Sequence, residues 1–405
     1  MKWSKDQENA IKARNCNLLV SAAAGSGKTA VLIERILSQV MDKEKPVDID
    51  SILVVTFTKA AAGEMKARLS KAFETALKDN PCNKHLIRQM GLVENAKICT
   101  IDSFCTGILK NYYNTIGLEP DFRTAEDGEL NLVKDDVLQE LLEEKFKEAD
   151  KDFLDFVEAF SPGKKLDNLS ELILDLHRFS QSKPWPMEWL DECERIFDIR
   201  DADEYLGLPI VERIFGYIKS SLESMLADNE RMEEYCNMPD GPYQYLPAIN
   251  KDRELLLAAL EAKNLEDLRV YLENDIGNIG KAKDVNEELK ERVKDMRNKF
   301  KERIKAFRAD FCVPVELQLD ELRRCAPMAK VYINLVKEFT VRFQETKKDK
   351  NILDFPDIEH YALDVLVKRV DGACVITEIA DELAGQYNYI YIDEYQDSNL
   401  VQVDP

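Results

Sequence analysis

The chain has 405 residues, of which 45% are hydrophobic and 33% charged, and its net charge at pH 7 is −21. This composition is typical of a folded protein with two or three cores, and it excludes both a disordered chain and, since no long apolar run is present, a membrane-spanning one. The acidic balance disfavours extensive nucleic-acid contacts but is compatible with a local basic groove.

The first seven residues lack the apolar core of a secretion signal, so we expect a cytoplasmic protein without a membrane partner. The nine cysteines are scattered without Cys-x-x-Cys spacing, which predicts reduced thiols rather than a disulfide framework or a zinc site. With only three histidines, a histidine-rich metal site is not expected.

Apolar runs that read as parallel strands stand near both ends of the chain. We expect strands at Leu18–Val20, Ile52–Val55, Lys97–Thr100 and Tyr389–Ile392, the third being the weakest and the others buried. Helical patterns follow the first two strands, over Lys28–Met41 and Ala60–Leu77. Such strand–loop–helix repeats indicate an α/β fold in which helices cover a parallel sheet.

The middle of the chain, from about residue 124 to residue 350, has a helical pattern instead. Apolar residues recur there at three- and four-residue spacing, as in Leu130–Phe146, Leu166–Phe179, Arg253–Leu272 and Val285–Phe307. Because the strand pattern returns at the end, we expect one sheet that is split by a large all-helical inserted domain. The predicted divisions are residues 1–123, 124–325 and 326–405.

A glycine-rich segment, Ala22–Thr29, separates the first expected strand from the first expected helix, which is the context of a P-loop. Its glycines let backbone N–H groups wrap phosphate oxygens, and the positive end of the next helix points at the same phosphates. Lys28 is expected to reach the β and γ phosphates of ATP, and Thr29 to ligate Mg²⁺. The alternative is a glycine turn that only joins strand to helix. The predicted nucleotide-binding residues of this segment are Ala22, Ala23, Ala24, Gly25, Ser26, Gly27, Lys28 and Thr29.

A second polar segment, Asp393–Ser398, follows the last expected strand. Ligands of open α/β sheets bind at the carboxyl ends of the strands, where this segment begins. Asp393 can hold magnesium, directly or through water, and Glu394 can orient and deprotonate an attacking water. Gln396 can sense the γ-phosphate. A solvated acidic turn is the alternative, but the string Asp-Glu-x-Gln-Asp is more specific than that.

Together these segments resemble the UvrD-like branch of superfamily 1 DNA helicases. The resemblance implies a RecA-like P-loop domain that uses ATP and Mg²⁺. Gln7 stands before the phosphate loop, where that family has a glutamine that reads the adenine, and an exposed helix residue is the alternative. The segment Asp354–Ile358 resembles the family's return into the ATP-binding domain, and we interpret it as mainly structural.

The segment Thr56–Met65 resembles a motif with which that family contacts single-stranded DNA. Thr56 belongs to the string, Phe57 at a strand end can stack on a base, and Thr58 and Lys59 can meet phosphates. The alternative is an ordinary strand-to-helix corner with Phe57 in the core.

The segment Thr100–Cys105 resembles the family's next DNA-contacting motif. Ser103 is a plausible hydrogen-bond donor to DNA. Asp102 stands where many members have histidine, and since a carboxylate repels phosphate, we do not expect that side chain to touch DNA.

The stretches Trp3–Gln7 and Ser182–Leu190 are similar to those of the AddA family, the helicase–nuclease subunits of AddAB (RexAB) complexes. The resemblance implies an ATP-dependent DNA helicase that binds single-stranded DNA, processes double-strand DNA ends for recombinational repair, and forms a heterodimer with an AddB/RexB-type partner. We expect this chain to be an N-terminal part, with a second RecA-like domain and a C-terminal exonuclease domain following Pro405. Because an arginine finger is worth ~10³–10⁵ in rate, such a part should bind ATP better than it hydrolyses it.

Three rivals stay open at this point. They are a UvrD-like repair helicase without a nuclease domain, a P-loop enzyme unrelated to DNA such as a kinase, and a non-catalytic scaffold whose nucleotide site organises partner subunits. The two segments that resemble DNA-contacting motifs argue against the kinase.

A basic stretch reverses the global charge between Lys281 and Arg308, where eleven Lys or Arg stand against six acids. Duplex-DNA binding and a solvated helix face balanced by acids are equally good interpretations of it. The residues that recur at helical spacing are Lys283, Lys290, Lys294, Arg297, Lys301 and Lys305.

Overall fold

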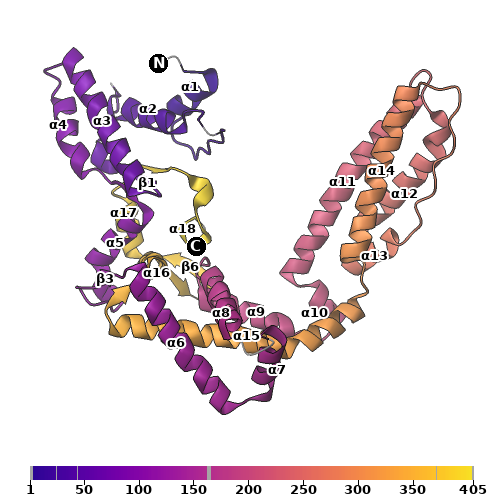
Figure 1. The fold of residues 1–405 in the computed structure, drawn as a ribbon. Coiled ribbons are helices and arrows are strands. Elements are labelled where there is room, and N and C mark those ends of the chain that lie inside the picture. Colours follow the sequence, from indigo (N-terminus) through magenta and orange to yellow (C-terminus); the bar gives the residue numbers. More distant parts are fainter. Residues whose placement is uncertain (1–2, 24, 43, 162–165, 371, 404–405) are drawn as a thin grey trace. The chain divides into compact units, whose positions relative to one another are not determined.

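A computed structural model of the chain describes residues 3–23, 25–42, 44–161, 166–370 and 372–403. Two compact units are present (Figure 1). Unit 1 consists of Met1–Lys147, Leu166–Trp189 and Val336–Pro405, and unit 2 consists of Glu148–Lys165 and Leu190–Leu335. Within the described ranges, no helix is long and apolar enough to cross a membrane. All nine cysteines are free thiols, as expected.

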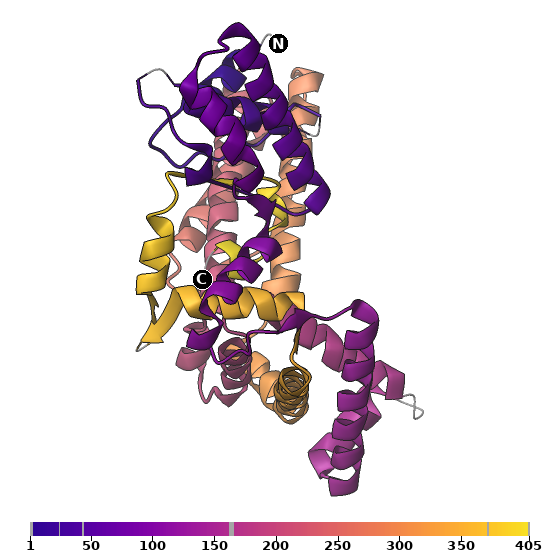
Figure 2. The same ribbon diagram turned by 90° about the vertical axis from the view of Figure 1, so that its left-hand side faces the viewer.

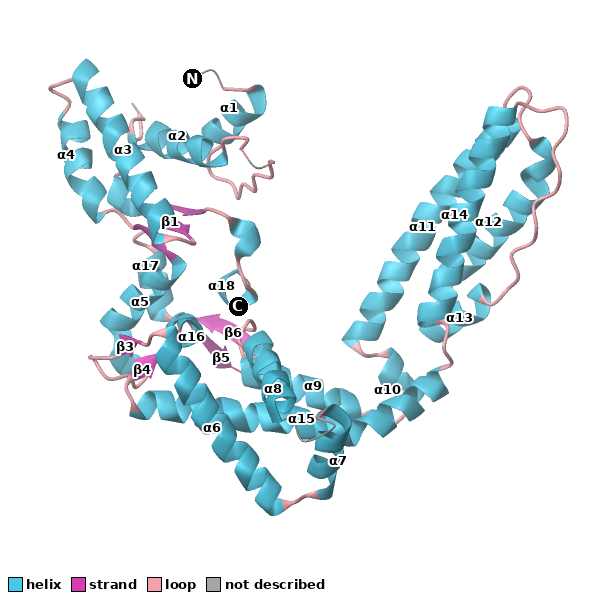
Figure 3. Cartoon of the chain, in the orientation of Figure 1, coloured by secondary structure: helices cyan, strands magenta, loops and turns pink. Residues whose placement is uncertain are grey.

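Unit 1 contains a three-stranded parallel sheet in the order β2–β1–β7. The strands of this sheet are the magenta arrows near the label β1 in Figure 3. The strands are β1 (Ile52–Thr56), β2 (Ile98–Thr100) and β7 (Tyr389–Ile392). Val54 in the central strand is opposite Ile98 on one side and Tyr391 on the other. Three of the four strands expected from the sequence are therefore confirmed, including the return of the chain into the sheet at its far end.

The expected strand Leu18–Val20 is not formed. These residues have no strand pairing, and Leu19 is 77% exposed. A strand needs a neighbour that satisfies its backbone N–H and C=O groups, and among the described residues β7 pairs only with β1. An apolar run of three residues is also too short to specify a strand by pattern alone. The prediction of a buried strand at this place is wrong.

Helices α2 (Lys28–Val40), α3 (Lys59–Asp79) and α4 (Lys84–Leu92) share an apolar core with the sheet. The apolar stripe of α3 has a spacing of four residues through Met65, Leu69 and Phe73, which buries one face of the helix. Figures 1 and 2 show α3 and α4 packed side by side. Tyr389 and Tyr391 of β7 pack against this core. Ile390 and Ile392, which point to the opposite face of the strand, are 59% and 39% exposed. The expectation that this strand is buried is thus wrong.

A second core of unit 1 lies between α5 (Ile101–Tyr112) and α16 (Phe355–Leu366). Its buried side chains include Ile108 and Leu109 of α5 and Ile358 and Ala362 of α16. The smaller elements of this unit are α1 (Lys5–Lys12), the parallel pair β3 (Arg123–Thr124) and β4 (Ile352–Leu353), the hairpin β5 (Val367–Val370) and β6 (Ala373–Ile376), α17 (Glu378–Ala384) and α18 (Leu400–Val403).

Arg369 of the hairpin strand β5 contacts two side chains of the stretch Ser182–Leu190. The Arg369 guanidinium lies 4.4 Å from the centre of the Trp185 ring and 3.0 Å from the Glu188 carboxylate. A guanidinium over an aromatic face, with a carboxylate beside it, is a favourable arrangement. This stretch therefore has a structural place in unit 1.

Two long helices expected within the insertion, α6 (Asp127–Glu148) and α8 (Leu166–Ser180), belong largely to unit 1. Both contact the last part of α15 (Val315–Asp349). Arg342 pairs with Glu144 of α6 at 2.6 Å, and Phe339 packs edge-on against His177 of α8. The units therefore divide the chain at places other than residues 123 and 325, because α15 carries its contacts to α6 and α8 on the segment that leads back to the sheet.

The described part of unit 2 is helical. Its elements are α7 (Lys151–Phe160), α10 (Ala202–Leu206), α11 (Pro209–Asn237), α12 (Leu246–Leu260), α13 (Leu265–Leu272) and α14 (Glu287–Phe311), together with most of α9 (Pro186–Arg195) and the first part of α15. The expected helix Arg253–Leu272 is broken, since Asn264 caps a new helix by accepting from the Asp267 N–H at 2.8 Å. An ion pair between Arg297 of α14 and Asp252 of α12 connects these two helices, and each of the two side chains is 2% exposed.

Several basic residues of α14 are paired within unit 2. Lys290, Lys294 and Lys299 each bind an acid three or four residues earlier, at 2.6–2.8 Å. Arg297 is buried in its ion pair, and Arg308 donates to the Leu272 carbonyl at 2.6 Å. These contacts favour a helix face balanced by acids over a surface that binds duplex DNA.

Candidate functional site

The glycine-rich segment forms a loop that leads directly into α2. Gly25 and Gly27 adopt φ values of +76° and +86°, the left-handed region that glycine occupies without a side-chain penalty. Gly27 is the N-cap residue and offers no side-chain cap, so the first N–H groups of α2 have no capping side chain. A Cβ atom at Gly25 would meet nothing within 4 Å. The loop thus has open space beside Gly25 and leads into an uncapped helix N-terminus, an arrangement that fits a phosphate group.

Lys28 and Gln7 lie on this loop. The Lys28 ammonium donates to the Ala22 carbonyl at 3.0 Å, and the Gln7 side-chain amide donates to the Ser26 carbonyl at 3.1 Å. Gln7 also forms a capping box with Ser4 at the start of α1, which fixes its direction. Ala23 accepts from the Ser26 N–H at 3.2 Å, whereas Ala24 lies outside the described residues. The structure therefore brings Gln7 next to the phosphate loop, while its role in reading adenine stays a prediction.

The acidic segment begins where β7 ends. The Asp393 N–H continues the strand ladder by donating to the Val55 carbonyl at 2.9 Å. Burial raises the pKa of Asp393 above its ordinary value, and the adjacent Glu394 raises it further, while the positive charge of Lys28 acts in the opposite direction. Lys28 and Asp393 thus lie within each other's electrostatic field, and the two halves of the predicted nucleotide site meet.

Glu394 occupies a strained backbone position. Its φ of 53° is in the left-handed region, which a glutamate rarely adopts and which is enriched at functional turns. The short helix η6 (Tyr395–Asp397) follows, and the Gln396 side-chain amide donates to the Glu394 carboxylate. Gln396 thus holds Glu394 rather than lining the cavity itself.

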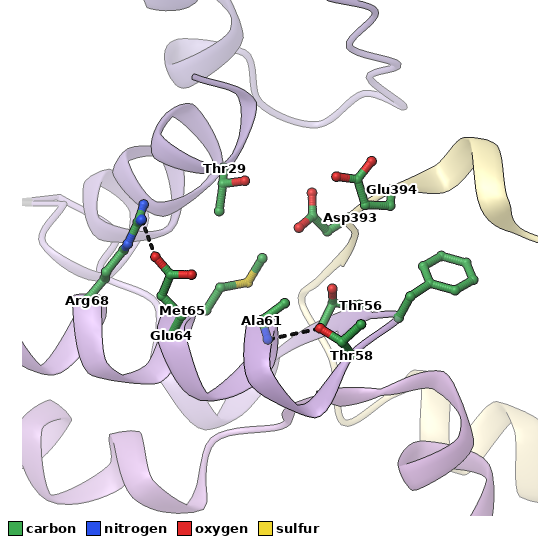
Figure 4. Close-up of a pocket in the computed structure, with 10 residues that line it drawn as sticks. Thr29, Thr56, Thr58, Ala61, Glu64, Met65, Arg68, Asp393 and Glu394 are labelled. Atoms are coloured by element: carbon green, nitrogen blue, oxygen red, sulfur yellow. Dashed lines mark hydrogen bonds and ion pairs between the residues drawn. The ribbon is translucent and has the colours of Figure 1, made fainter. Parts of the chain in front are cut away.

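One cavity of about 250 Å³ joins the two predicted sites (Figure 4). Its walls come from α2, the end of β1, the first turns of α3 and the end of β7. Thr29 faces Asp393 and Glu394 across the opening (Figure 4). The lining residues are Thr29, Thr56, Phe57, Thr58, Ala61, Glu64, Met65, Arg68, Asp393 and Glu394.

A hydroxyl and a carboxylate on one cavity suit Mg²⁺, which binds through one or two protein oxygens together with phosphates and water. Thr29 and Asp393 are the residues that would hold it. The described residues contain no cluster of three or more His, Cys, Asp or Glu side chains that could hold a metal by themselves. The donor set therefore fits an ion that arrives with a nucleotide.

The sequence reasoning missed the Glu64–Arg68 ion pair on this wall. Glu64 belongs to the segment Thr56–Met65, but its sequence position alone suggested no role, and Arg68 lies beyond that segment. Their i, i+4 spacing on the helix that follows Thr58 was the signal that could have found them. Arg68 places a cation on the cavity wall.

The segment Thr56–Lys59 has different degrees of exposure along its length. Thr56 is 1% exposed and is paired with Thr100 in the sheet, so its burial does not support the expected direct DNA contact. Phe57 is half-buried, and Thr58 and Lys59 are exposed. The Thr58 hydroxyl accepts from the Ala61 N–H at 3.1 Å and caps α3. Phe57 therefore lies at the rim of the cavity and is not enclosed in the core.

The second segment caps α5 in the same way. The Thr100 hydroxyl oxygen accepts from the Ser103 N–H at 3.1 Å and lies 2.7 Å from the exposed Ser103 hydroxyl. Burial raises the pKa of Asp102, Glu359 raises it further, and Lys59 lowers it. The charges of Lys59 and Asp102 therefore influence each other. The segments Thr56–Met65 and Thr100–Cys105 thus lie close together in unit 1.

Comparison with known proteins shows what this arrangement is similar to. The model of a family described as UvrD/REP helicase N-terminal domain matches residues 3–404. The chain is 42% identical over 99% of its length to an ATP-dependent helicase/nuclease subunit from Lachnoclostridium phytofermentans, and it covers 30% of that protein. Proteins of the same name from Clostridium beijerinckii and Geobacillus kaustophilus are 38% and 37% identical over 99% of the chain, which covers 33% of each. The resemblance to AddA expected from the motifs is confirmed, and the chain spans about a third of the length of these relatives.

Proposed function

Since the chain belongs to the UvrD/REP helicase N-terminal domain family, we propose that it forms the ATP-binding N-terminal portion of an ATP-dependent DNA helicase/nuclease subunit. The observation that carries this proposal is the single cavity on which Thr29, Phe57 and Asp393 all lie. A nucleotide in that cavity would be adjacent to a strand held by Phe57. This arrangement would suit an enzyme that converts hydrolysis into movement along DNA.

In this proposal the phosphate loop binds ATP. The uncapped N-terminus of α2 and the flexible backbone of Gly25 and Gly27 cradle the phosphates. Lys28 exchanges its bond to the Ala22 carbonyl for the β and γ phosphates. Gln7, oriented by its capping box, is close enough to the loop to read the base.

The acidic turn carries out the chemistry of hydrolysis. Thr29 and Asp393 hold Mg²⁺, which neutralises phosphate charge when it is bound. Glu394 orients the attacking water and accepts its proton, while Gln396 holds that carboxylate and senses the phosphate through it. Efficient turnover would need an arginine finger, which belongs to the longer protein in this proposal.

Single-stranded DNA binds along the edge formed by the two capped helices. Phe57 stacks on a base, and Lys59, Thr58 and Ser103 contact phosphates or sugars. Asp102 does not touch the strand, because a carboxylate repels phosphate, and its nearness to Lys59 limits the basic surface there.

The relatives share a name that describes one subunit of a helicase/nuclease. This name supports a partner protein, which we propose to be of the AddB/RexB type. The full-length protein would process double-strand DNA ends in the cytoplasm for recombinational repair. Its exonuclease activity would come from a part outside this chain.

ATP hydrolysis by the full-length protein with its partner tests the proposal. We expect single-stranded DNA to stimulate hydrolysis. We also expect Glu394→Gln to abolish stimulated turnover while ATP affinity stays within about twofold of the parent. Glu74→Gln, at an exposed position on α3, is the matched control. An ATPase rate that does not change with DNA would contradict the helicase assignment. Normal turnover by Glu394→Gln would instead favour the interpretation of the chain as a non-catalytic scaffold.

A further inference from the structure

The Glu359 side chain on α16 is bonded to the segment that follows the acidic turn. One carboxylate oxygen accepts from the Asn399 side-chain amide at 3.0 Å, and the other accepts from the Gln402 side-chain amide at 2.5 Å. The first distance is typical of an N–H···O bond, and the second is shorter than the usual range. Glu359 thus accepts hydrogen bonds from side chains at both ends of the turn that begins α18.

Asn399 and Gln402 also hold each other. The Asn399 N–H donates to the Gln402 side chain at 3.3 Å, and the Gln402 N–H donates to the Asn399 side chain at 3.1 Å. Helix α18 has only four residues, too few to be stable without tertiary contacts. Glu359 and the buried Val401 therefore anchor residues 399–402, which follow η6 after Ser398. Glu394 is the N-cap residue of η6, and Gln396 lies within it.

Glu359 also lies on the helix that packs against α5. Burial raises the pKa of both Asp102 and Cys105, and the negative charge of Glu359 adds to each shift, so that the pKa of Cys105 is raised to about 12. Both residues lie on the first turns of α5, directly after the Thr100 cap. A rigid apolar core between α5 and α16, built on Leu109 and Ile358, joins the two helices. Packing between the helices and the repulsion between two carboxylates are the two physical links between the first turn of α5 and α16.

We propose that Glu359 is a positioning residue that couples the single-strand contact segments to the acidic turn of the nucleotide site. This inference rests on the proposed function. DNA bound at Lys59 and Ser103 shifts the first turn of α5, and Glu359 transmits the shift to Asn399 and Gln402, and so to Glu394. Glu359 touches neither the nucleotide nor the DNA.

The test compares ATP hydrolysis with and without single-stranded DNA, using the full-length protein with its partner. Glu359→Ala removes both amide bonds, and we expect it to lower the DNA stimulation of kcat by about fivefold or more. Hydrolysis without DNA and the Kd for an oligothymidylate should each stay within about twofold of the parent. Glu359→Gln keeps an acceptor oxygen and should recover part of the stimulation. Glu382→Ala, at an exposed position on α17, is the matched control.

Asn399→Ala removes the hydrogen bond between Asn399 and Glu359 by changing the donor in place of the acceptor. If Glu359 acts through Asn399, the double variant should lose little more stimulation than Glu359→Ala alone. The inference is overturned if Glu359→Ala keeps full stimulation, or if it lowers both rates in proportion, together with Tm, as a purely structural residue would. Should Glu359→Ala fail to fold, Glu359→Gln and Asn399→Ala carry the test. Absence of stimulation in the unsubstituted protein would instead contradict the proposed function.

Discussion

Thr29 and Asp393 line one cavity, although Thr29 stands in the first turn of α2 and Asp393 follows β7 near the other end of the chain. The sheet explains their meeting, since β1 pairs directly with β7 and both strands end at the same edge. The site therefore exists only when the last strand has joined the sheet. Any substitution that loosens β7 should affect nucleotide chemistry as well as stability.

Replacing Lys28 by alanine should abolish ATP binding. The ammonium is expected to reach the β and γ phosphates, and it already lies over the loop at the Ala22 carbonyl. Titration with ATP and magnesium, followed calorimetrically, measures the effect. Lys71→Ala, at an exposed position on α3, should bind like the parent. Unchanged affinity in Lys28→Ala would contradict the P-loop assignment.

The loop and the acidic turn could be predicted because their chemistry is local. Backbone freedom at Gly25 and Gly27 and the start of α2 at Lys28 follow from consecutive residues. The strands Ile52–Thr56 and Tyr389–Ile392 are likewise marked by short β-branched or aromatic runs.

The strand expected at Leu18–Val20 shows where local pattern fails. Three apolar residues do not form a strand without a partner edge, and pairing is a property of the whole sheet. Glu359 was missed for a related reason. Its partners Asn399 and Gln402 stand far along the chain, and a lone glutamate on an amphipathic helix reads as a solvated residue.

Replacing Phe57 by alanine should weaken binding of single-stranded DNA by ~1–3 kcal/mol, the usual worth of one stacked base. The ring is half-buried at the rim of the cavity, so it has a face available for stacking. Fluorescence anisotropy with a labelled oligothymidylate gives the affinity. Phe57→Trp keeps an aromatic face and should retain most of it. Equal affinities for the alanine variant and the parent would exclude a stacking role.

Replacing Lys347 by methionine should destabilise unit 1 by about 3–5 kcal/mol, because it leaves buried carboxyls without their cation. The ammonium lies 2.9 Å from Asp354 and 2.6 Å from Asp357, and all three residues are buried. Burial raises the pKa of Asp357 to about 6 even with Lys347 beside it. Urea unfolding measures the loss, and Lys348→Met, one residue further and exposed, is the control. A loss no larger than in the control would show that the cluster is not stabilising.

The buried His177 should make stability fall as the pH is lowered from about 6.5 to about 4. Burial is the main reason that the pKa of His177 is lowered from 6.5 to about 4, and the charges of Lys347 and Lys134 contribute to this shift while Asp354 acts in the opposite direction. The ring is held neutral, with Nδ1 2.9 Å from the Thr340 hydroxyl oxygen, whose own proton is directed to the Val336 carbonyl. Between these pH values the unfolded chain binds a proton at this residue and the folded chain does not.

The contribution of His177 is therefore complete above pH 6.5 and is lost on acidification, with a maximum near 3 kcal/mol, about 1.4 kcal/mol for each unit of the shift. Urea unfolding at several pH values gives the slope. His177→Gln keeps a hydrogen-bond donor for Thr340 but does not titrate, so its stability should change less with pH across this window. Parallel curves for the variant and the parent would mean that protonation of another group controls acid unfolding.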